Sequence, residues 1–93
     1  MNAPTVVGLV TPHLLRIVDL ANDAEKAINV EFHVRESVSR TMEELSLQYN
    51  AAALVAAYVE GLENAAAQVP RIRGAYISTL RAAAAAARNL ARD

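Results

Sequence analysis

Few side chains in this 93-residue sequence have the type and spacing that chemistry requires. His13 and His33 are the only histidines; they stand twenty residues apart, and His13 is expected in the exposed first turn of a helix. Zinc sites use short helical spacings such as His-x-x-x-His or Glu-x-x-His, and neither spacing occurs. The sequence contains no cysteine to supply a thiolate ligand or a disulfide. We therefore expect neither a bound metal ion nor a cofactor.

Acidic side chains gather around Arg40, with Glu36, Glu43 and Glu44 nearby in the sequence. Glu36 and Glu44 each stand four residues from Arg40, a helical spacing that favours weak surface ion pairs over a carboxylate pair for acid–base catalysis. The sequence also lacks a glycine-rich phosphate loop and a serine-nucleophile motif. We therefore predict no catalytic residues, no enzymatic activity and no small-molecule substrate.

A third polar group, Glu31, Arg35 and Arg73, occupies positions of an otherwise apolar helical repeat. One interpretation is that these long side chains flank the apolar seam and reach water at its edge. The other is a polar layer that fixes the register of packed helices or the choice of partner, as polar seam residues can do. Both interpretations place the three residues at an interface, and neither implies catalysis.

Helices are predicted to position these residues, because apolar residues recur at alternating intervals of three and four positions along the chain. One repeat runs from Leu14 to Tyr49 and a second from Val55 to Leu90, as in helices that pack along a seam. Thr11-Pro12 marks the first helix start, since threonine caps free N–H groups and proline lacks one. The predicted segments are a flexible lead-in at 1–10 and a single helical domain at 11–93, with a helix at 12–49, a turn at 50–53 and a helix at 54–92.

The two repeats are mirror images about Ala52, so a turn there would place Glu31 opposite Arg73. The predicted fold is therefore all-α, a long antiparallel helical hairpin. Its second helix is expected to be kinked or broken near Pro70, whose ring removes a backbone hydrogen bond. The two halves of the chain carry opposite net charge, which favours packing one against the other. Residues 1–50 carry four basic and seven acidic side chains, and residues 51–93 carry five basic and three acidic side chains.

Strict alternation of apolar and polar residues over Ile28–Val34 offers an alternative, because it is the pattern of a strand. A strand there, followed by two helices, would be similar to a ribbon-helix-helix DNA-binding regulator, with Asn29, Glu31 and His33 facing the major groove. Acidic and neutral groups are poor readers of DNA, and the basic C-terminal segment lacks interleaved aromatic residues. We favour the helix, and nucleic acid is not the expected partner.

Several large apolar residues lie outside the predicted seam. They are Val18, Leu20, Val30, Phe32, Val34, Leu54, Tyr58 and Ile77. A lone pair of helices buries only one stripe of each helix, so these residues need a second surface. Two hairpins packed as a four-helix bundle would cover them. We therefore expect a non-enzymatic interaction or assembly protein that acts as a homo- or hetero-oligomer, with itself or a similar small helical protein as partner.

The length, the loose N-terminus and the two long helices with a central turn resemble the WXG100 (ESAT-6-like) substrates of type VII secretion. Where that family places Trp-x-Gly, this chain has Gln48-Tyr49-Asn50. Neither Tyr58 nor Tyr76 begins the family's C-terminal Tyr-x-x-x-Asp/Glu signal. The resemblance implies a secreted or secretion-associated dimer of the chain with itself or a relative, without enzymatic activity.

Two features bear on localisation. The N-terminus lacks the basic stretch that opens an ordinary signal peptide. The longest uncharged apolar run, Ala51–Val59, is far shorter than the roughly 20 residues needed to span a bilayer. We therefore expect no membrane span and a cytoplasmic location, or export without a conventional signal peptide.

Overall fold

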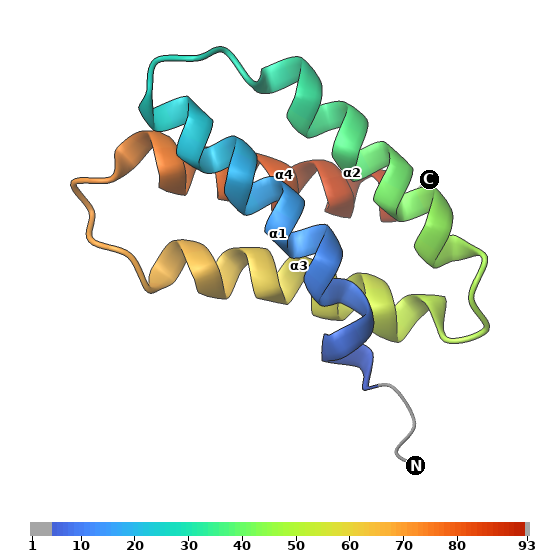
Figure 1. Cartoon of the computed structure of the whole chain (residues 1–93). Coiled ribbons are helices and arrows are strands. Elements are labelled where there is room, and N and C mark those ends of the chain that lie inside the picture. Colours follow the sequence, from blue (N-terminus) through green and yellow to red (C-terminus); the bar gives the residue numbers. More distant parts are fainter. Residues whose placement is uncertain (1–4, 93) are drawn as a thin grey trace.

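Four helices replace the two long helices that the apolar repeats predict. The computed structural model describes residues 5–92, and within them the chain is all-α, as expected, with no strand. The elements are α1 (Val6–Glu25), α2 (Glu31–Ser46), α3 (Ala51–Ala67) and α4 (Gly74–Arg92). Helices α1, α3 and α4 pack most extensively on one another, and α2 packs chiefly against α4. Figure 1 shows α1 crossing in front of α3 and α4. The predicted two-helix hairpin is therefore wrong.

Helix α1 begins earlier than Thr11-Pro12. Thr5 is its N-cap, and the Thr5 hydroxyl accepts a hydrogen bond of 3.0 Å from the Gly8 N–H. Pro12 lies inside the helix, although an interior proline removes a backbone bond. The longer helix gains the burial of Val10, which is only 1% exposed. The lead-in predicted at 1–10 is therefore wrong from residue 6 on, and residues 1–4 lie outside the described part of the chain.

The helix predicted at 12–49 is interrupted just after α1. Ala27 has φ 64°, the left-handed conformation that ends many helices and that glycine usually provides. The Ala27 N–H donates to the Ala24 carbonyl at 3.2 Å, and the Ile28 N–H donates to the Asp23 carbonyl at 3.4 Å. These two bonds satisfy carbonyls at the end of α1 in the pattern of a Schellman motif. The break went unpredicted because alanine, the best helix former, occupies the left-handed position.

Replacing Ala27 by glycine is expected to stabilise the protein by up to about 1 kcal/mol. An L-residue costs roughly 1–2 kcal/mol in the left-handed conformation, and the greater freedom of glycine in the unfolded chain offsets part of that gain. In the continuous helix predicted from sequence, the same change would destabilise by about 1 kcal/mol. Urea denaturation followed by circular dichroism measures the sign. Ala85→Gly, at an exposed position inside α4, is the control and should lower stability; a loss for both variants would contradict the break.

The segment Ile28–Val34 is not a strand. The Asn29 side-chain oxygen accepts from the Glu31 N–H at 3.1 Å at the start of α2, and the helix continues from there. Val30 and Val34 are buried and face the core four residues apart, whereas Phe32 is 64% exposed. The apolar residues of the alternating pattern therefore divide between two faces of a helical segment. This removes the strand on which the ribbon-helix-helix alternative depends.

The remaining two connections fall near the predicted places. The turn expected at 50–53 lies at 47–50, because α2 ends at Ser46 and α3 begins at Ala51. The interruption expected near Pro70 is confirmed: residues 68–73 separate α3 from α4. Tyr49, predicted to pack in the seam, is instead fully exposed within the first of these turns.

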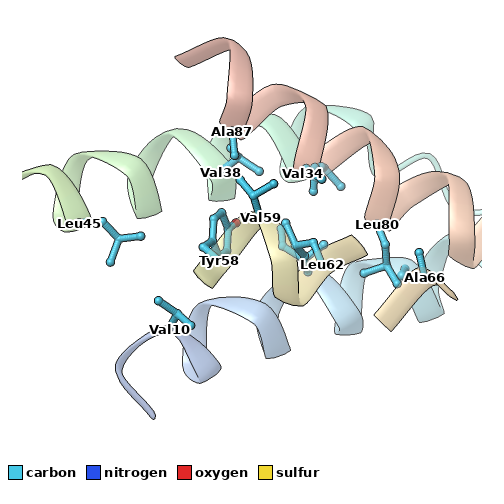
Figure 2. Close-up of a cluster of buried hydrophobic side chains, with 14 of the residues drawn as sticks. Val10, Val34, Val38, Leu45, Tyr58, Val59, Leu62, Ala66, Leu80 and Ala87 are labelled. Carbon is cyan, nitrogen blue, oxygen red and sulfur yellow. The ribbon is translucent and has the colours of Figure 1, made fainter. Parts of the chain in front are cut away.

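The core forms within one chain, from all four helices (Figure 2). Tyr58, Ile17, Leu62, Leu80 and Val38 are at most 1% exposed. The apolar residues assigned to an oligomer interface lie largely inside: Val30, Val34, Leu54 and Tyr58 are buried, and Val18, Leu20 and Ile77 are partly buried against the core. Only Phe32 of that set is exposed. The second surface that these residues require is supplied by the other helices of the same chain, so they do not call for a partner.

Small residues let the helices approach closely. A Cβ atom added to Gly61 of α3 would lie 2.7 Å from Leu14 Cδ1 of α1, inside van der Waals contact. Along α4, Ala83, Ala84 and Ala87 are each at most 1% exposed. Close packing at these points keeps α1 and α4 against α3, while the grooves described below open on either side of α2.

Candidate functional site

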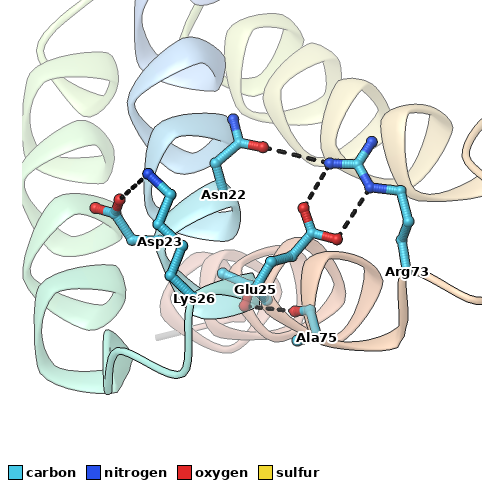
Figure 3. A network of polar contacts seen from close by, with 7 residues as sticks. Asn22, Asp23, Glu25, Lys26, Arg73 and Ala75 are labelled. Carbon is cyan, nitrogen blue, oxygen red and sulfur yellow. Dashed lines mark hydrogen bonds and ion pairs between the residues drawn. The ribbon is translucent and has the colours of Figure 1, made fainter.

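The three polar seam residues do not form one layer. Arg73 instead binds Glu25 at the end of α1: Arg73 Nε donates to Glu25 Oε2 at 3.0 Å, and Nη2 donates to Oε1 at 2.7 Å (Figure 3). Nη2 also donates to Asn22 Oδ1 at 3.3 Å, and the guanidinium lies 4.1 Å from the centre of the Tyr76 ring. The predicted pairing of Arg73 with Glu31 is wrong, because the break after α1 changes the register.

This network fastens the connection at 68–73 to the end of α1. The hydrogen bond from Arg73 lowers the pKa of Glu25 and raises that of Arg73, so both groups hold their charges. A carboxylate stabilised in this way accepts hydrogen bonds and is a poor general acid near neutral pH. The pair is partly exposed, where most ion pairs contribute little to stability, but its bidentate geometry fixes the orientation of both side chains. The network is structural.

A second polar cluster is buried between α1 and α2. His13 is only 8% exposed, contrary to the expected exposed first turn, because it lies in the interior of α1, four residues before Ile17 and on the same buried face. His13 Nδ1 lies 3.3 Å from the hydroxyl of the fully buried Thr41 and 3.2 Å from Arg16 Nη1. On the other side of the ring, His13 Nε2 lies 3.6 Å from Glu44 Oε2.

The electrostatics of this cluster favour a neutral imidazole. Burial lowers the pKa of His13, the Arg16 charge lowers it further, and Glu44 opposes both effects. Because the Arg16 N–H donates to Nδ1, that nitrogen holds the lone pair and the ring proton belongs on Nε2, facing Glu44. The order hydroxyl, imidazole, carboxylate is that of a nucleophile with its base and orienting acid. The Thr41 hydroxyl is sealed from substrate, however, so we assign the cluster a structural role.

A hollow of about 990 Å³, here called the α2–α3 groove, opens on the described surface. Its walls come from the C-terminal half of α2, residues 51–63 of α3 and the end of α4. The lining is mostly apolar: Met42, Val55 and Val59 lie in it with several alanines. The groove exists because α2 packs chiefly against α4 and only lightly against α3.

Only some of the charged side chains that line the α2–α3 groove have an ion-pair partner. Glu63 and Arg88 form an ion pair with each other. Glu43 and Glu60 also line the groove, and neither has an ion-pair partner among residues 5–92. Arg92, the remaining charged lining residue, closes the α4 end. The groove therefore offers an apolar floor with two carboxylates, and at its α4 end one guanidinium, that have no ion-pair partner among residues 5–92.

Exposed apolar side chains surround the same place. Leu90, which lines the α2–α3 groove, is 42% exposed. Leu47 and Tyr49 are 84% and 101% exposed in the turn that joins the two lining helices. Isolated exposed apolar residues are ordinary, but a cluster beside an apolar groove is typical of a binding surface. The apolar repeat placed Tyr49 in the seam, so the sequence pattern gave no indication of this surface.

Two smaller hollows lie along α2. The α2–α4 groove, of about 610 Å³, is lined by Ile28, Glu31, Val34 and Arg35 facing small residues of α4. A polar hollow of about 590 Å³ lies between α1 and α2 and includes His33. The expected ion pair between Glu36 and Arg40 is present there, at 3.1 Å.

Other classes of site find little support in the described residues. Residues 5–92 contain no group of three or more His, Cys, Asp or Glu side chains arranged to hold a metal ion. None of the four described helices combines the length and the apolar character that crossing a membrane requires. Comparison with family models, with curated proteins and with solved structures finds no match to the chain.

Proposed function

We propose that the protein is a non-enzymatic interaction protein that binds an amphipathic helix of a partner in the α2–α3 groove. The observation that carries this proposal is the groove itself, an apolar hollow of about 990 Å³ bounded by three helices. Met42, Val55 and the alanines of its lining offer contact surface but few hydrogen-bonding groups. Such a surface favours the apolar stripe of a helix, whose backbone groups are already paired.

The charges define the partner further. Glu43 and Glu60 have no ion-pair partner among the described residues and border the apolar lining. A helix with lysine or arginine beside its apolar stripe would pair with them, whereas an acidic helix would be repelled. The proposed ligand is therefore an amphipathic helix with a basic flank, and the similar small helical proteins expected from sequence are one source of it.

A synthetic peptide tests the proposal. A fluorescently labelled amphipathic helix of about 16 residues, roughly 24 Å long, carries a leucine and alanine stripe flanked by lysines. We expect it to bind with micromolar affinity, measured by fluorescence anisotropy, and a glutamate-flanked version to bind at least about tenfold more weakly. Ala56→Arg, inside the groove, should abolish binding. Ala53→Arg is the matched control, since Ala53 is exposed on the same helix but outside the groove.

Three outcomes would contradict the proposal: no binding of either peptide, equal binding of both, or equal loss for the two arginine variants. Circular dichroism of each variant checks that the helical content is retained. The secretion-associated role implied by the family resemblance remains a prediction, and the four short helices add no support to it, because that resemblance rests on two long ones.

A further inference from the structure

The polar contacts that join α2 to the rest of the bundle come from one side chain. Among the described residues, two polar side-chain contacts reach from α2 to another helix, and His13 of α1 makes both. His13 Nδ1 lies 3.3 Å from the Thr41 hydroxyl, and Nε2 lies 3.6 Å from Glu44 Oε2. The other side-chain bonds between elements join α1 to the connection at 68–73 and α3 to α4. The two nitrogens of one imidazole therefore fasten α2 to α1.

The same stretch of α2 forms a wall of the α2–α3 groove. Met42 and Glu43, which line the groove, lie between Thr41 and Glu44 in the sequence. Helix α2 packs only lightly on α1 and α3, and more extensively on α4. A lightly packed element can shift at a smaller cost in free energy than unfolding of the whole domain. Loss of the His13 contacts would therefore act on a weakly held wall, and the groove residues would move with it.

The contacts require an uncharged imidazole. His13 Nδ1 lies 3.2 Å from Arg16 Nη1, and a guanidinium can only donate, so Nδ1 accepts in this arrangement. A second ring proton would occupy Nδ1 and face the Arg16 donor, which replaces a hydrogen bond by repulsion between two positive groups. On the other side of the ring, Glu44 would attract the charged imidazole. The Glu44 side chain is 52% exposed, however, so water screens much of that attraction.

Each packed helix contributes to this balance. Burial lowers the pKa of His13, Arg16 of α1 lowers it further, and Glu44 of α2 raises it without cancelling the decrease. From α3, Tyr58 approaches the Thr41 hydroxyl; burial raises the Tyr58 pKa, so that group stays neutral. Within the described residues, no charged group of α4 shifts the pKa of His13. Because that pKa lies below its ordinary value of 6.5, the contacts are fully present above pH 6.5 and are lost as the pH falls through the lowered value.

We propose that His13 makes the α2–α3 groove sensitive to pH: protonation of its ring in mildly acidic solution shifts the C-terminal half of α2 away from α1 and releases the bound helix. This inference rests on the proposed function, because the groove must first bind a helix. The proton binds more tightly once the ring has left Arg16 and reached water, so it favours the shifted arrangement. The partner helix binds better to the unshifted groove, and the two ligands therefore oppose each other.

Fluorescence anisotropy with the lysine-flanked peptide, from about pH 7.5 to about pH 5, tests the regulation. We expect the affinity to fall at least about fivefold across this range, the lower end of ordinary coupling between two sites. His13→Gln retains a donor toward Glu44 but does not titrate, so it should lose most of that fall. His33→Gln is the matched control and should keep the full fall, because His33 is exposed and lies outside the groove.

Two further variants test the mechanism even if His13→Gln fails to fold. Arg16→Gln removes a charge that lowers the pKa of His13, so the pH midpoint of release should rise. Glu44→Gln removes the charge that raises this pKa, so the midpoint should fall. A general loss of stability would not move the midpoint in opposite directions. Titration of the His13 ring followed by NMR should show the same two shifts without peptide.

The outcomes separate this inference from the proposed function. Binding at about pH 7.5 that is equally strong at about pH 5, or that falls as much in His13→Gln as in the unaltered chain, would overturn the regulation and leave the proposed function standing. Midpoints that move in the same direction in Arg16→Gln and Glu44→Gln would also overturn it. Absence of binding at both pH values would contradict the proposed function and the regulation together, whatever the His13 ring does in the peptide-free titration.

Discussion

Replacing Tyr58 by alanine is expected to lower the free energy of unfolding by about 3–5 kcal/mol, the range for removing a large buried ring. Tyr58 is 0% exposed and is among the largest fully buried side chains of the described chain. Figure 2 shows it among core residues that include Val38 and Val59. A small domain has about 5–15 kcal/mol of stability, so this variant loses a large part of it.

The chain supplies a matched control of the same residue type. Tyr49 is fully exposed in the α2–α3 turn, and Tyr49→Ala should change stability by no more than about 0.5 kcal/mol. The sequence-based hairpin predicts the opposite ranking, because it places Tyr49 in the seam and Tyr58 outside it. Urea denaturation of both variants, followed by circular dichroism, decides between the two. Equal losses, or a greater loss for Tyr49→Ala, would contradict the four-helix core.

The Tyr58 hydroxyl separates the effect of the ring from that of its polar group. Burial raises the pKa of Tyr58, and Thr41 and Arg16 oppose that shift. Thr41 is near, but the hydroxyl has no partner with the geometry of a full hydrogen bond. An unpaired buried hydroxyl is unfavourable, so Tyr58→Phe should leave stability unchanged or raise it slightly. The loss in Tyr58→Ala then belongs to the ring.

The apolar repeats predicted part of the core, although Tyr58, which they left outside the seam, is also buried. Leu62, Tyr76, Leu80 and Ala83 belong to the apolar repeat and are buried. The repeat keeps its phase across residues 68–73, so it marks inward-facing residues on both sides of a connection without revealing it. Pro70 gave the main local signal of that connection.

The break after α1 lacked such a signal. Ala27, in the left-handed conformation, is an ordinary helix former, and only Asn29 marked the start of the next helix. The break decides which polar groups meet: it brings Arg73 to Glu25, whereas a continuous helix would bring it to Glu31. Both candidate grooves depend on how helices diverge in space. The spacing of residues within one helix does not determine how far two helices diverge, so the grooves could not be predicted from the sequence.

The six consecutive alanines of α4, residues 82–87, look equivalent in sequence but differ in their surroundings. Ala83, Ala84 and Ala87 are at most 1% exposed, whereas Ala82 and Ala85 are exposed. Ala83→Leu should therefore lower stability by about 1–3 kcal/mol, because extra methyl groups in a filled core force side chains and backbone to shift. The larger side chain must separate α4 from the helices packed on it.

Ala85→Leu makes the same chemical change two positions away, on the exposed side of the helix, and should alter stability by no more than about 0.5 kcal/mol. Leucine is nearly as good a helix former as alanine, so intrinsic propensity does not separate the two variants. Denaturation followed by circular dichroism measures both variants. In a two-helix hairpin, residue 83 lies in a seam open on both flanks, where leucine would add apolar burial and raise stability. A higher free energy of unfolding for Ala83→Leu would therefore argue against a core in which the other helices enclose α4. A loss of stability for Ala83→Leu but not for Ala85→Leu would show that the packing of α4 requires small side chains at its buried positions.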